Sequence, residues 1–155
     1  MRYTETYKKR SVTKMIRVLA TGTFDILHPG HILYLEKAKA LGDELFVIVS
    51  RDAMVQHKQK PIIPEQQRLR VVRALAVVDH AELGSERDIF EPLLSIKPDV
   101  VALGFDQYFD EKELQGDLEK RRISSKVIRV PFQDTGELSG TESIVQEIIK
   151  RRVKC

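Results

Sequence analysis

The strongest constraint on the fold is a short segment in which a strand, a glycine-containing turn and a helix follow one another directly. Residues 16–20 form an apolar run of strand length that is rich in branched side chains. Residues 32–41 place apolar side chains at helical spacing, and the connection between the two runs contains Gly22 and Gly30. A helix that begins at such a turn directs free backbone N–H groups and the positive end of its dipole above the strand. The segment therefore predicts an anion site, for which phosphate is the natural ligand.

Two histidines, His28 and His31, flank the expected start of this helix. Each imidazole can form a hydrogen bond with an anion, and Gly30 between them lets the backbone come close to a ligand. A pair of histidines at this spacing is usually structural when it occurs alone. The Gly-Thr-Phe-Asp sequence before it, with a strand ahead and a helix behind, favours catalysis here.

The ten residues from Gly22 to His31 resemble the signature of the cytidylyltransferase-like nucleotidyltransferases. The resemblance implies transfer of a nucleoside monophosphoryl group from a triphosphate to a phosphorylated acceptor, with release of pyrophosphate. It also implies that this segment binds the nucleotide through Thr23, Phe24, His28, Pro29, Gly30 and His31, with the two histidines catalytic.

Two further segments narrow the resemblance. Gly104–Gln107, after the expected fourth strand, and Pro61–Arg68 together resemble archaeal-type FAD synthases, which are FMN adenylyltransferases of the same small fold. The resemblance spans residues 16–150. It implies that Asp106 contacts the nucleotide or its metal, although capping of the following loop is an alternative role for this carboxylate.

The resemblance also implies basic residues on the phosphates. Arg68, at the start of the second helix, is expected to reach phosphate, because a planar guanidinium holds two oxygens and keeps its charge. Either Lys58 or Lys60, in the connection before that helix, is expected to contact the triphosphate; a solvated surface loop would have the same composition.

The C-terminal region departs from the family pattern, because Asp134 occupies the place where relatives often carry an arginine. Ser139 and Thr141 precede the last expected helix. They are expected to present its N–H groups to a phosphate, although capping of the helix alone explains them equally well.

Strand-like and helical segments alternate along the chain, which predicts an α/β fold: a single Rossmann-like, doubly wound parallel sheet of about five strands. Ligands of such sheets bind at the carboxyl ends of the strands, where the strand order reverses. The expected strands are 16–20, 44–50, 77–83, 100–103 and 126–130; the expected helices begin near Gly30 and Pro64 and cover 89–96, 111–121 and 143–152.

The size and charge of the chain limit the other possibilities. Its 155 residues suit one domain, expected over 15–155. Residues 1–14 contain five basic and one acidic side chain, which accounts for the net charge of +3, and are expected to form a basic, partly disordered extension. Such a tail could contact nucleic acid, but a solvated extension is the favoured interpretation, and nucleic acid is not expected as a partner. The chain has no apolar run of membrane-spanning length, and its one cysteine is Cys155, so a cytoplasmic protein is expected.

Three functions are compatible with these observations. The favoured one is an adenylyltransferase that makes FAD from ATP and FMN. The second is a cytidylyltransferase that uses CTP and glycerol 3-phosphate or another small phosphoester, and the third is a nucleotide-sensing or nucleic-acid-binding protein that has kept the pocket. A flavin needs a wide apolar slot, whereas glycerol phosphate needs a small polar one. A divalent ion, most simply Mg²⁺, is expected to bridge the phosphates without a cage of protein ligands, and the resemblance implies a homodimer.

Overall fold

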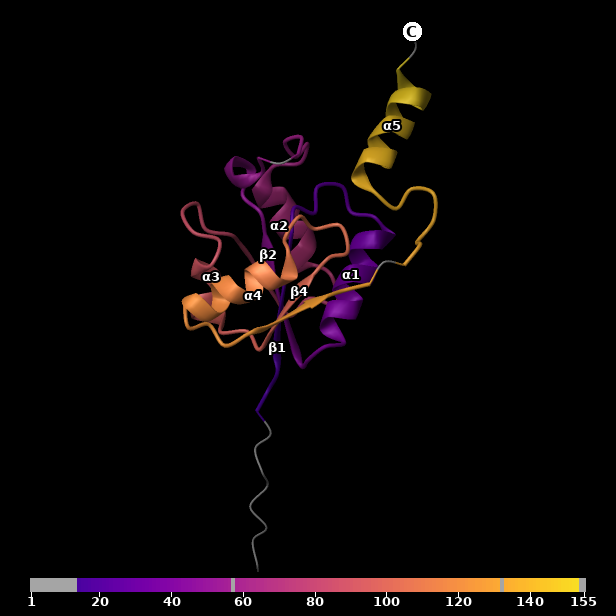
Figure 1. Ribbon diagram of the computed structural model, residues 1–155. Helices are drawn as coiled ribbons and strands as arrows, with labels where there is room; N and C mark the ends of the chain where they lie inside the picture. The colour runs from indigo at the N-terminus through magenta and orange to yellow at the C-terminus, as the bar shows by residue number, and fades with distance from the viewer. Residues whose placement is uncertain (1–13, 57, 132, 154–155) are drawn as a thin grey trace, which may run out of the picture.

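The computed structural model describes residues 14–56, 58–131 and 133–153 (Figure 1). Over these residues, strands and helices alternate from end to end. The strands are β1 (Arg17–Gly22), β2 (Glu44–Val49), β3 (His80–Leu83), β4 (Val100–Leu103) and β5 (Lys126–Arg129). The helices are α1 (Pro29–Lys39), a 3-10 turn η1 (Asp52–Met54), α2 (Glu65–Arg73), α3 (Glu91–Ile96), α4 (Glu111–Lys120) and α5 (Thr141–Arg152).

The five strands form one parallel sheet in the order β3-β2-β1-β4-β5. The order reverses between β1 and β4: β2 and β3 extend the sheet on one side of β1, and β4 and β5 extend it on the other side. This confirms the predicted doubly wound, Rossmann-like fold. The turn after β1 and the loop after β4 therefore emerge side by side at the carboxyl end of the sheet.

Each face of the sheet carries its own apolar core. On one face, Leu35 of α1 and Val72 of α2 pack against alternate residues of β1 and β2. On the other face, Leu93 of α3 and Leu118 of α4 pack against the remaining ones, among them Leu19. Strands buried on both faces read as continuous apolar runs, which is why residues 44–50 were recognisable as a strand.

The third strand is shorter than its sequence predicts. It begins at His80, whereas Val77 lies in the turn after α2. Val77 and Val78 are apolar because they pack against the core below α1 and α2, not because they pair with β2. Apolar character marks burial, and here it extends beyond the hydrogen-bonded strand.

Helix α5 lies apart from the body of the molecule (Figure 1). It begins at Thr141, two residues earlier than expected, and none of its residues is buried. The connection from β5 runs past α1 before it reaches this helix (Figure 1), and the start of α5 lies beside the turn, where Thr141 contacts Ile26.

Of the expected basic extension, residues 1–13 lie outside the described part of the chain, and Lys14 forms an ion pair with Asp99. No helix within the described ranges is both long enough and apolar enough to cross a bilayer.

Candidate active site

The turn between β1 and α1 has a backbone conformation that side chains rarely adopt. Phe24 has a φ of 53°, and its ring is buried. Gly22 makes room for that ring, because a Cβ at position 22 would lie 2.7 Å from the Phe24 Cζ. Backbone held in such a region costs energy and is found where function requires it. The predicted phosphate-binding turn is therefore formed by a fixed and unusual backbone.

His28 and His31 meet at the start of α1. Their rings stack with centroids 3.8 Å apart and planes 28° from parallel, and Phe24 lies against His31 at 5.3 Å. Pro29 occupies the first helical position, where its missing N–H costs nothing. The Nδ1 atoms of both histidines are buried, and no partner for either is found among the described residues. Buried polar atoms without partners are uncommon and suggest a site for a ligand.

Both imidazoles are held in the neutral form. Burial is the main cause that lowers the pKa of His31 to about 3, and the neighbouring His28 and Lys58 lower it further. Burial also lowers the pKa of His28, while the nearby Asp106 carboxylate acts in the opposite direction. At neutral pH each ring thus carries one N–H donor and one acceptor nitrogen.

Gly30 is where the last part of the chain meets the histidines. A Cβ at this position would lie 2.8 Å from the carbonyl oxygen of Ser139 and 2.9 Å from Nδ1 of His28. Thr141, at the start of α5, donates from Oγ1 to the carbonyl of Ile26 at 3.5 Å. The structure therefore places Ser139 and Thr141 beside the turn and the start of α1, and their contact with a phosphate stays a prediction.

A cavity of about 540 Å³ opens at the carboxyl end of the sheet, on the face covered by α3 and α4. Thr21, Gly22 and Thr23 form its edge beside the turn, and Lys58 and Asp106 also line it. The remaining wall is mainly apolar and includes Ile48, Ile89, Phe90, Leu93, Val101, Leu103, Phe109 and Leu114. A smaller hollow of about 50 Å³, lined by Gly30, Tyr34 and Ser139, lies beside the start of α1.

Lys58 and Lys60, either of which the sequence allows as a contact for the triphosphate, lie in different surroundings. Lys58 lines the cavity and is close enough to His31 to lower its pKa. Lys60 donates to the backbone carbonyl of Asp52 at 2.9 Å. Of the two lysines, Lys58 is therefore the one that lines the cavity, and its contact with a phosphate stays a prediction.

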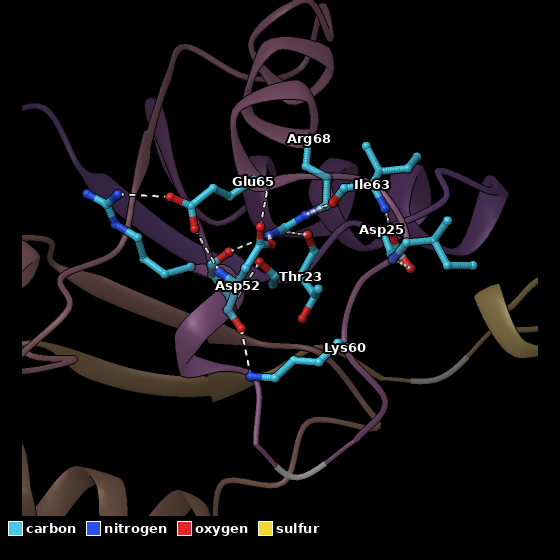
Figure 2. Close-up of polar contacts among 11 residues, drawn as sticks. Thr23, Asp25, Asp52, Lys60, Ile63, Glu65 and Arg68 are labelled. Carbon is cyan, nitrogen blue, oxygen red and sulfur yellow. Dashed lines mark hydrogen bonds and ion pairs between the residues drawn. The ribbon is translucent and has the colours of Figure 1, made fainter.

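Arg68 is the residue whose place differs from the expectation. Its side chain is fully buried, and its guanidinium is directed into the protein (Figure 2). It donates to the carbonyls of Ile63 and Ser50 at 2.8 Å each, to the carbonyl of Thr23 and to the Asp52 carboxylate at 2.6 Å. Four of its five N–H groups are thus engaged within the protein. In this structure Arg68 does not present its charge to the phosphate site, because four nearby backbone and carboxylate oxygens hold it inside.

Two residues outside the expected site join β1 to β4 at the point of reversal. The amide of Gln107 accepts from the N–H of Gly104 at 2.8 Å and donates to the carbonyl of Thr21 at 2.5 Å. The Tyr34 hydroxyl accepts from the Thr21 N–H at 3.2 Å and donates to the Ala102 carbonyl at 2.8 Å. Gln107 belongs to the Gly104–Gln107 segment, whereas Tyr34 gave no signal beyond its place on the apolar side of α1.

Arg129 fixes the loop that forms one wall of the cavity. From β5 it donates to the carbonyls of Gly104 at 2.8 Å and Gln107 at 3.2 Å, to the carbonyl of Phe109, and to Glu111 at 2.7 Å. The sequence does not reveal this role, because the partners of Arg129 lie 18 to 25 residues earlier in the chain.

The described residues contain no cluster of three or more histidine, cysteine, aspartate or glutamate side chains that could hold a metal ion. Asp106 alone brings a carboxylate to the cavity beside the turn. This donor set does not form a cage, but it suits an ion such as Mg²⁺ that takes most of its ligands from phosphates and water.

Comparison with known proteins places this geometry in a family. A model of the cytidylyltransferase-like family matches residues 19–146. The FAD synthase of Methanothrix thermoacetophila is 55% identical over 138 residues, which cover 89% of this chain and 96% of the relative. The FAD synthase of Methanosarcina mazei is 58% identical over 137 residues, covering 88% and 91% of the two chains.

Solved structures agree on the fold. A lipopolysaccharide core biosynthesis protein from Thermoplasma volcanium superposes with a TM-score of 0.75 at 48% identity, covering 78% of this chain and all of that one. A pantoate–β-alanine ligase from Francisella tularensis superposes with a TM-score of 0.59 at 18% identity, covering 89% and 67%, a likeness of fold alone. The family match spans the histidine pair, the cavity and the loop after β4, and the chain therefore belongs to the cytidylyltransferase-like family.

Proposed function

We propose that this protein is an FAD synthase, which transfers AMP from ATP to the phosphate of FMN and releases pyrophosphate. The observation that carries the proposal is the adjacency of a phosphate-binding turn, with its neutral histidine pair, to a large apolar cavity. The naming of the relatives described above as FAD synthases, at more than half identity over nearly their whole length, supports it.

The cavity suits a flavin better than a small acceptor. Its volume of about 540 Å³ lies in the range of sites for drug-sized ligands, and its wall combines aliphatic side chains with Phe90 and Phe109. The flat faces and dimethylbenzene edge of the isoalloxazine ring would be buried there, with the phosphate of FMN directed toward Thr23 and Lys58. Glycerol 3-phosphate would leave most of the cavity unfilled and would present hydroxyl groups to an apolar wall.

The reaction requires little of a general base. An oxygen of the FMN phosphate attacks the α-phosphorus of ATP; a new P–O bond forms as the bond to the β-phosphate oxygen breaks, and pyrophosphate leaves on the opposite side. A phosphate monoester already carries its second negative charge near neutral pH, because its second pKa is ~6. Catalysis then rests on positioning and on stabilisation of the charge that moves to the leaving group.

The residues of the site divide this work. His28 and His31 donate hydrogen bonds to the phosphates, and Lys58 neutralises part of their charge from the cavity side. The backbone N–H of Phe24 and those of the first turn of α5, which follow Ser139 and Thr141, bind the other phosphate oxygens. Asp106 is placed to receive the nucleotide or a water of its metal. A Mg²⁺ ion, when bound, supplies charge neutralisation between the phosphates.

We also propose that the protein is a homodimer that associates through α5. The exposed side chains of this helix include Ile148 and Ile149, at 50% and 54% exposure. Its aliphatic residues form one stripe at helical spacing: Ile144, Val145, Ile148 and Ile149. A second copy of α5, antiparallel to the first, completes this stripe.

The aliphatic positions of α5 are placed symmetrically about its centre, which lies between Gln146 and Glu147. In an antiparallel pair Ile144 faces Ile149 of the second copy, and Glu142 faces Arg151 of the second copy, so apolar and opposite charges both match. Sedimentation velocity tests this arrangement. Ile148→Asp is expected to give a monomer, and Leu94→Asp, at an exposed site on α3, to leave the mass unchanged; a dimer that persists in Ile148→Asp contradicts it.

The activity is tested by supplying ATP with FMN, and CTP with glycerol 3-phosphate, and measuring both pyrophosphate and the nucleotide product. We expect FAD and pyrophosphate in equal amounts from the first pair only. Turnover of the second pair alone would assign the cytidylyltransferase activity, and nucleotide binding without any pyrophosphate would indicate a sensor.

A further inference from the structure

Arg68 connects three segments of the chain that approach the phosphate-binding turn, through four acceptors. Its acceptors are Thr23 after β1, Ser50 after β2, Asp52 in η1 and Ile63 before α2 (Figure 2). No two of these acceptors belong to the same secondary-structure element. A guanidinium can satisfy such a set because its donors are fixed in one plane and point outward in several directions.

One of these bonds acts directly on the turn. A trans peptide is planar, so its carbonyl oxygen and the following N–H point in opposite directions. The bond from Arg68 draws the carbonyl of Thr23 toward the interior, and the N–H of Phe24 must then point away from Arg68. Within the described part of the chain nothing accepts a hydrogen bond from this N–H. Phe24 itself has a left-handed φ of 53°, and rotation about its N–Cα bond sets how the same peptide plane lies relative to the rest of the turn.

The neighbouring contacts hold Arg68 and the turn in place. The Asp25 carboxylate accepts from the N–H groups of Ile62 and Ile63 at 2.9 and 2.8 Å, which ties the turn to the same segment whose carbonyl Arg68 binds. Asp52 and Glu65 each accept the other's backbone N–H, at 3.2 and 2.7 Å. Partial burial of Asp52 acts in the opposite direction, but its hydrogen bond with Arg68 keeps the pKa of this carboxyl below its usual value.

We infer that Arg68 is a positioning residue for phosphate transfer: it aims the N–H of Phe24 at the nucleotide phosphates through its bond to the Thr23 carbonyl. The inference rests on the proposed function, because it assumes that the turn binds those phosphates. It replaces the direct contact between Arg68 and phosphate that the sequence suggested. Any cation could form an ion pair with Asp52, whereas binding several carbonyls at once requires the planar guanidinium of Arg68.

Lysine and arginine carry the same charge, but only arginine has a planar guanidinium with five N–H donors, and this difference makes the inference testable. Arg68→Lys keeps the charge beside Asp52 but cannot reach three carbonyls from different segments, and Arg68→Met removes both. The matched controls are Arg70→Lys and Arg70→Met, because Arg70 is exposed on the same helix. For each protein we would measure the melting temperature, the number of ATP sites by titration, and kcat and KM for both substrates.

We expect Arg68→Lys to recover most of the melting temperature that Arg68→Met loses. Its kcat per ATP site should nevertheless stay about 10- to 100-fold below wild type, as expected for misplacement of a transition-state contact. The KM for FMN should change less than kcat, because the guanidinium binds Thr23 and Ser50 at the edge of the cavity and does not itself line the apolar wall. If kcat recovers in parallel with the melting temperature, Arg68 acts through its charge and the inference is wrong.

A second measurement on the wild-type protein does not depend on the folding of the variants. The chain has six phenylalanines, so ¹⁵N-phenylalanine labelling gives a simple amide spectrum. We expect the Phe24 amide resonance to move when a non-hydrolysable ATP analogue is added, and a resonance that stays in place would overturn the inference. Wild-type turnover of ATP and FMN is measured in parallel. Failure of that turnover counts against the proposed function, whereas an unmoved Phe24 resonance in an active enzyme counts only against the role of Arg68.

Discussion

The imidazoles of His28 and His31 stack at 3.8 Å, and each leaves a buried Nδ1 without a partner among the described residues. Within the described part of the chain, no oxygen or nitrogen is paired with either of these buried atoms. A polyphosphate placed over the start of α1 supplies acceptor oxygens, and its negative charge favours protonation of the rings. The pair is therefore better matched to the ligand than to the empty site.

Replacement of His31 by alanine is expected to reduce kcat about 100-fold or more, because it removes a donor that stabilises charge on the leaving group. The fold should persist, since His31 packs at the edge of the turn and not in the core of the sheet. The matched control is His80→Ala. His80 stacks on Phe46 and is the first residue of β3, so it lies at the amino end of the sheet, away from the site. Steady-state rates with saturating ATP and FMN test this prediction; normal turnover of His31→Ala would show that His31 is not catalytic.

The stability of the protein should depend on His31 at mildly acidic pH. Its pKa is about 3 in the folded protein, against 6.5 for an unperturbed histidine. Between these values the unfolded chain binds a proton that the folded protein does not, so the free energy of unfolding falls as the pH drops from about 6.5 toward about 3. Carboxylates with lowered pKa, such as Asp52 and Asp99, add their own loss at lower pH.

The contribution of His31 is isolated by comparing wild type with His31→Asn. Melting temperatures from pH 7 to pH 4 should fall less steeply in the variant, which has no imidazole to protonate. Parallel curves for the two proteins would mean that the histidine is not held neutral by the fold.

Lys58 and Lys60 should differ in their effects on catalysis. Lys58→Met removes a cation from the cavity and should raise the KM for ATP or lower kcat by about 10-fold or more. Lys60→Met removes a bond to the Asp52 carbonyl and a charge near the Asp52 carboxylate, both away from the cavity, and should change either constant by about twofold at most. Initial rates over a range of ATP concentrations distinguish the two, and an equal loss in both variants would argue against the assignment of Lys58.

Gly30→Ala should abolish most of the activity, because its methyl group would lie 2.8 Å from the Ser139 carbonyl oxygen and 2.9 Å from His28 Nδ1. One of these groups must move, and both belong to the site. Gly116→Ala is the control: nothing lies within 4 Å of the added methyl group, and in the middle of α4 it should stabilise the protein by about 0.5–1 kcal/mol. Activity and thermal unfolding of the two variants are compared directly, and an active Gly30→Ala would contradict the tight packing at this point.

Structural features that are determined by residues close together in the sequence could be predicted from it. The strand, turn and helix around His28 and His31 follow from local spacing, and the alternation of elements is enough to give a parallel sheet. The places of Arg68 and Arg129 were not predictable in the same way. An arginine in a sequence shows only a charge, and whether it faces a phosphate or several carbonyls depends on segments that meet only after folding. The bonds from Arg68 to Thr23 and from Arg129 to Gly104 span 45 and 25 residues.

The most direct test of the central claim is a crystal structure of the protein with FMN and a non-hydrolysable ATP analogue. We expect phosphate oxygens within hydrogen-bond distance of His28, His31 and the Phe24 N–H, and the isoalloxazine ring in the cavity lined by Phe90. The FMN phosphate should lie opposite the leaving pyrophosphate. A nucleotide bound elsewhere, with both imidazoles turned away from it, would contradict the account.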